Sequence, residues 1–180
     1  MRFLRTSTPR ITRVLLVESG SRRLLEGVLP HLRNLLGDDT PFDLATCYAG
    51  LPAGLTPETS VYAVHEYRGQ QGRRSLYRLL RARRPEVLVM ICSGEPIMTK
   101  WKWALALRLP VKVLIVNENG DFFWFDRANW KTVRHFVVFR AGLAGGDAVR
   151  TIARVMVFPL TLAFLLLYAA LIHLRRKVHV

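Results

Sequence analysis

The chain has 180 residues and a mass of 20.6 kDa, which suffices for one domain of ordinary size with an appendage but not for two full α/β domains. Hydrophobic residues make up 51% of it and charged residues 22%, a composition that excludes a disordered polymer and a disulfide-stapled miniprotein. The 27 Lys and Arg outnumber the 13 Asp and Glu, so the formal net charge is +14. Such a charge favours polyanionic partners, either nucleic acid or an anionic lipid surface.

Short apolar runs alternate with amphipathic helical patterns between residues 11 and 140, which is typical of βαβ units and a parallel sheet. Leucines and valines recur at helical spacing between a Ser21 cap and a Gly37 stop. The predicted strands are Arg13–Val17, Phe42–Tyr48, Ser60–His65, Glu86–Cys92 and Val111–Val116, and further helices are predicted at Gly72–Arg83 and through Trp101–Leu107. We therefore expect an α/β fold with a Rossmann-like or flavodoxin-like open parallel sheet of about five strands over residues 11–140.

The two ends of the chain differ from this pattern. Residues 1–10 form a basic arm without the apolar stretch of a signal peptide, so we expect the globular part to be cytoplasmic. Residues 141–150 are predicted to be a Gly-rich linker, residues 151–175 a membrane helix and residues 176–180 a basic tail. The helix contains 18 consecutive uncharged residues, Val155–Ile172, which at ~1.5 Å per residue measure about 27 Å.

The orientation of that helix is open, because basic residues flank it on both sides. Pro159 favours a kinked helix that lies at the membrane interface instead of spanning it. A third interpretation, a buried core helix, would need protein on all sides, and the chain is too small to supply that.

Three polar loops follow predicted strands, at the edge where open parallel sheets bind ligands. Their candidate ligand-binding residues are Ser19, Gly20, Ser21, Ser93, Gly94, Asn117 and Asn119. Glu95, Glu118 and Asp121 are the candidate catalytic residues, each as a general base in a half-desolvated cleft. His65, beside Glu66, is a further possible base, and turn or capping roles are the alternative for all of these residues.

Metal and cofactor chemistry have no sequence support. No HExxH, paired CxxC, EF-hand loop or GxSxG occurs, so we expect neither a metal nor a cofactor. Cys47 and Cys92 lie inside apolar runs that are typical of buried strands. We therefore expect two free core thiols in a reducing compartment.

Aromatic and basic residues are interleaved in residues 121–140. Such a mixture can stack nucleobases or lie at a membrane interface, and the adjacent apolar segment favours the membrane. The expected interface residues are Phe122, Trp124, Trp130 and Arg134. Seven arginines between Arg68 and Arg84 either face lipid phosphates or an acidic protein, or form a solvated helix face.

Three segments give the chain a family resemblance: VLLVESGSRRLLEGVLPHL at Val14–Leu32, ICSGEP at Ile91–Pro96 and VLIVNENGDFFW at Val113–Trp124. Together they resemble the N-terminal, acceptor-side half of GT-B-type glycosyltransferases that act on lipid-linked acceptors. The resemblance implies that the family's acceptor loop corresponds to Ser19, Gly20 and Ser21. In that family a second Rossmann-like domain holds the donor nucleotide-sugar, and this chain has no counterpart of it.

The resemblance thus implies either a half-enzyme similar to the membrane-anchored subunit of the two-chain N-acetylglucosaminyltransferase of the dolichol pathway, or a degenerate relative that is kept for binding. We expect a membrane-associated glycosyltransferase-like subunit that acts near lipid-linked saccharides, with membrane lipids and a donor-binding protein chain as partners. The alternative is a non-catalytic accessory subunit of a membrane protein complex. Nucleic acid is the least favoured partner, because it gives the apolar segment no role.

Overall fold

The computed structural model describes residues 11–140, 153 and 157–169. The chain divides into two compact units, residues 1–130 and 131–180. The expected boundaries at residues 140, 150 and 175 remain predictions, since residues 141–152 and 170–180 lie outside the described residues.

The first unit is built on one sheet of six strands in the order β3-β2-β1-β4-β5-β6. Its strands are β1 (Val14–Val17), β2 (Phe42–Thr46), β3 (Val61–Ala63), β4 (Val87–Cys92), β5 (Lys112–Asn117) and β6 (Phe122–Trp124). Neighbours from β3 to β5 run parallel, with Val14 opposite both Phe42 and Val87. The Rossmann-like α/β sheet is therefore confirmed, in its coarse form of an open, mostly parallel sheet.

The sixth strand corrects the expectation of about five parallel strands. β6 pairs antiparallel with β5, with Val116 opposite Phe122. The chain returns through a tight turn after Asn117, where the Gly120 N–H donates to the Asn117 carbonyl at 3.2 Å. A two-strand hairpin thus replaces a further crossover helix at this edge.

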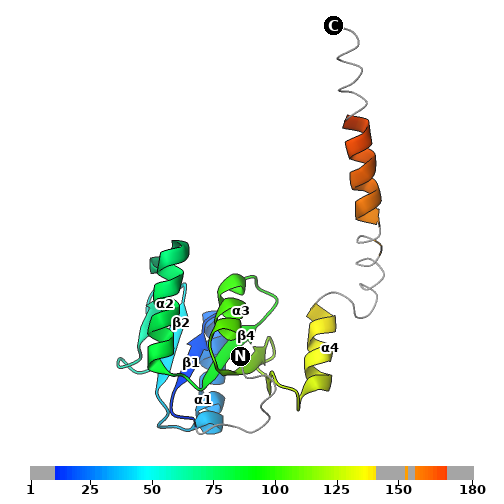
Figure 1. Cartoon of the computed structure of the whole chain (residues 1–180). Helices are drawn as coiled ribbons and strands as arrows, with labels where there is room; N and C mark the ends of the chain where they lie inside the picture. The colour runs from blue at the N-terminus through cyan, green and yellow to red at the C-terminus, as the bar shows by residue number, and fades with distance from the viewer. Residues whose placement is uncertain (1–10, 141–152, 154–156, 170–180) are drawn as a thin grey trace. The chain divides into compact units, whose positions relative to one another are not determined.

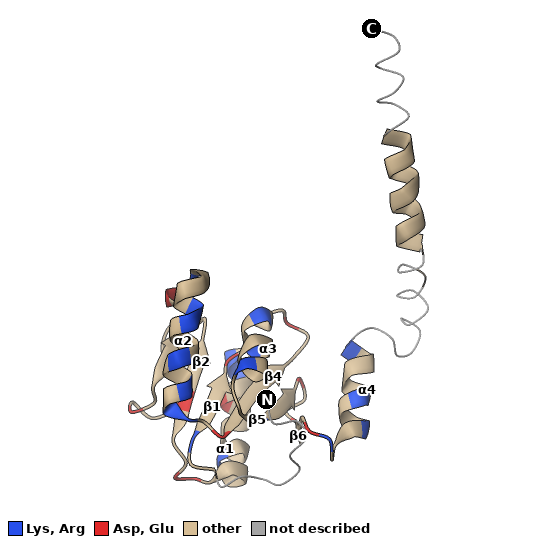
Figure 2. Cartoon of the chain, viewed as in Figure 1, with Lys and Arg blue, Asp and Glu red and all other residues tan. Residues whose placement is uncertain are grey.

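Helices cover both faces of the sheet. α1 (Arg22–Leu36) begins at Ser21, whose hydroxyl accepts from the Leu24 N–H, and ends at Gly37, as predicted. Its buried leucines pack in one core cluster with alternate residues of the central strands, such as Leu16 and Val89. α2 (Gly69–Arg83) and α3 (Thr99–Arg108) cover the other face (Figure 1). Arginines follow one another along α2 (blue in Figure 2).

Two segments differ from their predicted extents. β2 ends at Thr46, so Cys47 follows the strand and is exposed, which makes its assignment as a core thiol wrong. Cys92 is a buried thiol outside any disulfide at the end of β4, as expected. β3 has only three residues and leads into a 3₁₀ turn, η1 (Val64–Glu66), that contains His65.

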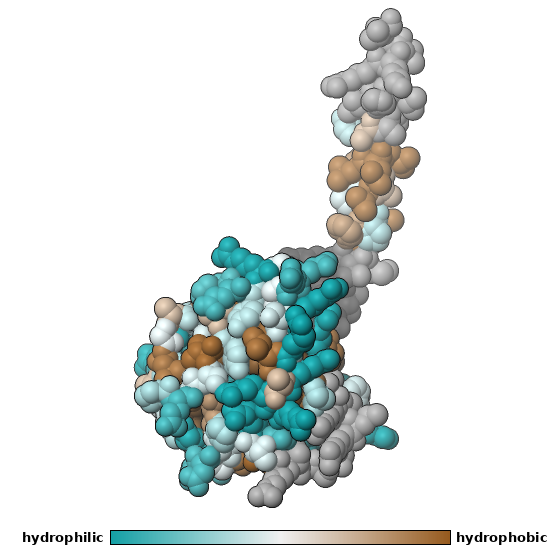
Figure 3. Space-filling view, turned by 60° about the vertical axis from the view of Figure 1, so that its left-hand side comes forward, coloured by the Kyte–Doolittle hydropathy of each residue, from teal (hydrophilic) through white to brown (hydrophobic). Residues whose placement is uncertain are grey.

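In the second unit, the described residues form helices. α4 (Trp130–Arg140) begins at the unit boundary, and residues 157–169 form a C-terminal helix whose side chains are exposed and mostly hydrophobic (Figure 3). The Phe164 and Tyr168 rings stack there with centroids 6.3 Å apart. No helix within the described residues is long and apolar enough to cross a membrane. Both ends of the helix predicted at residues 151–175 lie outside the described residues.

A buried ion pair ties β5 to the segment after β6. Lys112 Nζ lies 3.1 Å from Asp126 Oδ2, and both side chains are 2% exposed. The second Asp126 oxygen accepts from the backbone and side-chain N–H groups of Asn129. Burial by itself raises the pKa of Asp126, but the hydrogen bonds from Asn129 and Lys112 outweigh it and lower that pKa below its ordinary value.

This lowered pKa predicts an acid-sensitive contribution to stability. A carboxyl whose pKa is lower in the folded chain stabilises it above the unfolded-state pKa, about 3.9 for Asp, and the contribution is lost as the pH falls through the folded-state value. Asp126→Asn should lower the free energy of unfolding by about 3 to 5 kcal/mol near pH 7, because it removes the carboxylate that faces the buried Lys112 ammonium. It should also flatten the loss of stability below pH ~4.

Denaturant titrations of the full chain at several pH values, followed by near-UV circular dichroism, measure both effects. The exposed Asp39 supplies the control, since Asp39→Asn should leave the pH profile unchanged. An unaltered acid limb in the Asp126 variant would contradict the assignment.

Candidate functional site

The loops after β1 and β4 meet at the carboxyl edge of the sheet, where the strand order reverses. Gly20 lies so close to β4 that an ideal Cβ built on it would be 2.5 Å from Ile91 Cγ2. The Ser19 hydroxyl is fully buried and donates to the Ile91 carbonyl at 2.8 Å. These two predicted ligand residues therefore hold the loops together, and their polar groups face protein.

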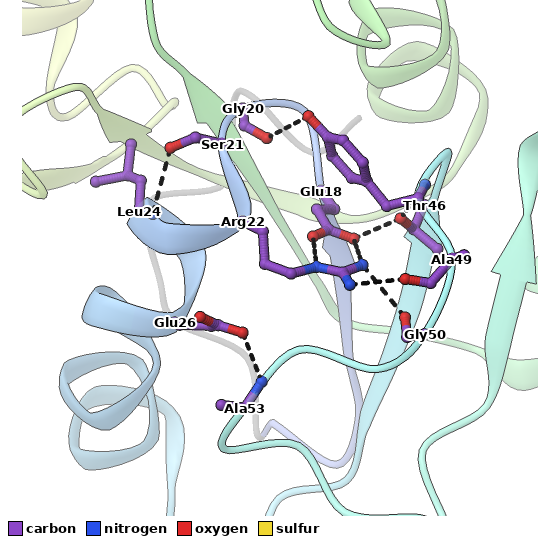
Figure 4. A network of polar contacts seen from close by, with 11 residues as sticks. Glu18, Gly20, Ser21, Arg22, Leu24, Glu26, Thr46, Ala49, Gly50 and Ala53 are labelled. Atoms are coloured by element: carbon purple, nitrogen blue, oxygen red, sulfur yellow. Dashed lines mark hydrogen bonds and ion pairs between the residues drawn. The ribbon is translucent and has the colours of Figure 1, made fainter.

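A buried carboxylate organises the same edge (Figure 4). The Glu18 side chain is 0% exposed and accepts from Arg22 at 2.8 Å (Nε) and 3.2 Å (Nη2). The Thr46 hydroxyl, at the end of β2, donates to the second Glu18 oxygen. Glu18 therefore joins the end of β1, the first residue of α1 and the end of β2.

Arg22 extends this network to the loop after β2. Its Nη1 donates to the Ala49 carbonyl at 2.7 Å and its Nη2 to the Gly50 carbonyl at 3.2 Å, and its guanidinium lies 5.4 Å from the centre of the Tyr48 ring. The hydrogen bond to Glu18 raises the pKa of Arg22 above its ordinary value. Sequence reasoning missed this pair, although an acid four residues before an arginine at a strand–helix junction was a usable signal.

A cavity lies between α1 and the turn from β5 to β6. Its volume is about 810 Å³. Gly120 brings the turn against the helix, since its φ is +83° and an ideal Cβ would lie 3.2 Å from Val28 Cγ1. The cavity is lined by Ser21, Arg23, Leu24, Gly27, Val28, His31, Asn119, Gly120, Asp121 and Phe122.

Asn117 shapes the turn that forms one wall of the cavity. Its side-chain oxygen accepts from the backbone N–H groups of Asn119 and Asp121, each at 2.9 Å. Its side-chain nitrogen donates to Asp121 Oδ2 at 3.1 Å. Asn117 thus orients Asp121 and does not itself line the cavity.

The structure brings four predicted site residues together at the cavity: Ser21, Asn119, Asp121 and Phe122. Gly94, Glu95 and Glu118 are exposed, and neither they nor the half-buried Ser93 line it. Sequence reasoning missed Arg23, Gly27 and His31, which face the cavity from successive turns of α1. Their spacing of four residues along a predicted helix could have indicated a common face.

The expected membrane-interface residues are placed differently from one another. Phe122 lines the cavity, and the half-buried Trp124 packs against the core, with Lys112 Nζ 4.7 Å from its ring centre. Trp130 is 54% exposed and Arg134 is exposed on α4. Their contact with lipid stays a prediction.

The cavity lining combines a solvent-exposed carboxylate, an amide, a hydroxyl, an imidazole and a guanidinium with the apolar side chains of Leu24, Val28 and Phe122. Such a lining can bind a ligand that carries several hydroxyl groups next to an apolar part. Among the described residues, no group of three or more His, Cys, Asp or Glu side chains is placed to hold a metal ion.

Comparison with known proteins found no match for the chain among family models, curated proteins or solved structures. The Rossmann-like classification therefore rests on the sheet order and strand directions described above.

Removal of Arg22 should destabilise the first unit by about 3 kcal/mol, because Glu18 would stay buried without its partner. The lower end of the range for buried pairs applies, since the Arg22 side chain is 28% exposed. Arg22→Met measures this loss in a denaturant titration, and adding Glu18→Gln to it should restore part of it. Arg23→Met, at the exposed neighbour, should change stability by less than about 0.5 kcal/mol; equal losses at Arg22 and Arg23 would refute the role of the pair.

Substitution by alanine should have opposite effects on stability at Gly20 and at Gly27. Gly20→Ala should cost about 1 to 3 kcal/mol, because the new methyl group must displace the buried Ile91 side chain. Gly27 lies in α1 with nothing within 4 Å of an ideal Cβ, so Gly27→Ala should stabilise by up to about 1 kcal/mol. Thermal unfolding of both variants measures these effects. An unchanged stability of the Gly20→Ala variant would exclude the close approach of the β1 loop to β4.

Proposed function

We propose that this chain is a membrane-associated, glycosyltransferase-like subunit that holds a lipid-linked saccharide acceptor and works with a donor-binding partner chain. The observation that carries the proposal is the cavity between α1 and the β5–β6 turn. It lies at the carboxyl edge of an open α/β sheet, where such folds bind their ligands. Its mixed polar and apolar lining suits a saccharide attached to a lipid.

Asp121 is the proposed general base. It is exposed, lines the cavity and is oriented by Asn117 through one oxygen. It would take the proton from an acceptor hydroxyl as that oxygen bonds to the anomeric carbon of the donor sugar and the nucleoside diphosphate leaves. Glu95 and Glu118, also predicted as bases, lie outside the cavity lining and are less suited to this role.

The C-terminal helix supports membrane association. The side chains of residues 157–169 are exposed and mostly apolar, among them Phe158, Leu160 and Leu167 at 67%, 72% and 69% exposure. Exposed apolar surface of this extent is typical of contact with a membrane or another protein. We propose the interfacial form, with this helix lying in the headgroup region.

The alternative proposal is a non-catalytic accessory subunit of a membrane protein complex. The same exposed helix favours it, because apolar side chains can equally pack against an integral membrane protein. Purification of the full chain from its membranes in detergent separates the two. A companion chain with a nucleotide-sugar domain supports the transferase, whereas a fixed-stoichiometry membrane assembly without one supports the accessory role.

The acceptor proposal predicts binding at the cavity without the partner. The full chain in neutral detergent should bind a short-chain isoprenyl-diphosphate saccharide, measured by saturation-transfer NMR against the isoprenyl alcohol. Gly27→Trp should abolish binding, because the indole would occupy the cavity from a position with open space around it, while Gly27→Ala retains it. Asp121→Asn should weaken binding about tenfold or more through loss of a charged hydrogen-bond acceptor. Undiminished binding in the Gly27→Trp variant would place the ligand elsewhere.

A further inference from the structure

Five arginines on the α2 and α3 side of the sheet have no role in the cavity described above. They are Arg74, Arg78, Arg81, Arg84 and Arg108, which come from α2, its C-terminal cap and the last residue of α3. All five are exposed. We call them the α2–α3 arginine surface. It lies on the opposite face of the sheet from α1 and therefore from the candidate acceptor cavity.

Two hollows mark this surface, and both are lined by Arg81 and Arg108. The larger, about 620 Å³, also includes Arg84 and lies where α2 and α3 end. The smaller, about 460 Å³, adds Arg74 and Arg78 and lies along the two helices. Because the two hollows share these guanidinium groups, they adjoin and together bring all five arginines to one surface.

Contacts other than ion pairs hold the shared arginines in place. Arg81 Nη2 donates to the Arg108 backbone carbonyl at 2.9 Å. The Arg108 guanidinium lies 5.1 Å from the centre of the Tyr77 ring, which in turn lies 6.3 Å from that of Trp101. The guanidinium groups are thus ordered before an anion arrives, which lowers the entropic cost of binding it.

The positive charge of this surface is only partly balanced within the described part of the chain. Within the described residues, none of the five arginines forms an ion pair with a carboxylate. Glu86 lines the larger hollow and supplies one negative charge there, held by hydrogen bonds from the Thr12 hydroxyl and from the backbone N–H groups of Thr12 and Arg13. One carboxylate leaves most of the charge of the five arginines unbalanced. An external anion is therefore the natural partner.

We infer that the α2–α3 arginine surface docks the first unit on an anionic phospholipid bilayer by binding its phosphate groups. Guanidinium groups match phosphate oxygens through paired hydrogen bonds. The inference extends the proposed function and rests on it, because docking requires that the chain is associated with a membrane. Lipid suits the surface better than nucleic acid for two reasons. The Tyr77 ring already contacts Arg108 and Trp101, so it is not available for base stacking. Nucleic acid also cannot cover the apolar side chains of residues 157–169.

The test measures how close α2 comes to the lipid headgroups. The full chain is reconstituted into vesicles of phosphatidylcholine, with or without phosphatidylglycerol, that contain a headgroup-labelled acceptor lipid. A donor dye is attached through Leu79→Cys, at a position of α2 that is 45% exposed, in a Cys47→Ser background. Cys92 is buried and does not compete for the dye. Energy transfer should rise with phosphatidylglycerol and fall with added salt.

A matched pair of variants separates the surface from net charge. Arg78→Gln with Arg81→Gln should reduce the ratio of docked to undocked chain by roughly thirtyfold, about fivefold for each arginine near an anionic bilayer. Arg68→Gln with Arg73→Gln removes the same charge from exposed positions at the start of α2 that line neither hollow. That control pair should retain most of the energy transfer.

Three results would overturn the inference: equal energy transfer in neutral and anionic vesicles, equal loss in both variant pairs, or capture of an added oligonucleotide in preference to the lipid through the same two arginines. Saccharide binding at the cavity is measured in neutral detergent, so it should survive the Arg78 and Arg81 changes. Its loss in the Gly27→Trp variant should likewise leave docking intact. Failure of the docking inference is thereby distinguishable from failure of the proposed function.

Discussion

The burial of the Glu18 carboxylate is the constraint on which the carboxyl edge of the sheet depends. A charge removed from water needs an opposite charge and hydrogen bonds, and Arg22 and Thr46 supply both. Since Arg22 is the first residue of α1, the pair fixes where the helix leaves the strand. The next turns of α1 form one wall of the cavity, so the position of that wall depends on this contact.

Much of the fold could be predicted from the sequence because the signals were local. The apolar runs of β1, β4 and β5 and the caps of α1 at Ser21 and Gly37 lie where their residue patterns place them. β6 was missed because it is three residues long and aromatic, so its strand identity comes only from pairing with β5. Cys47 was misplaced for a related reason, since the apolar run continues past the last paired residue, Thr46.

The candidate site was only partly predictable, because packing decides which polar groups are left over for a ligand. Ser19 follows a core strand, as many ligand-binding serines do, yet its hydroxyl is buried and donates to the Ile91 carbonyl. Asn119 and Asp121 were predicted as site residues in the turn after β5, and both line the cavity. Their cavity partners on α1 were not, because nothing in the local sequence says that the β5–β6 turn folds back against that helix.

The edges of the sheet have a consequence for self-association. Both edge strands, β3 and β6, have three residues, so each offers few free backbone groups to a strand from another copy. Long, flat edges are templates for fibril growth, and short ones are a known protection against it. This matters for a polypeptide that also exposes an apolar helix. Association of copies through that helix is not reinforced by strand pairing between their sheets.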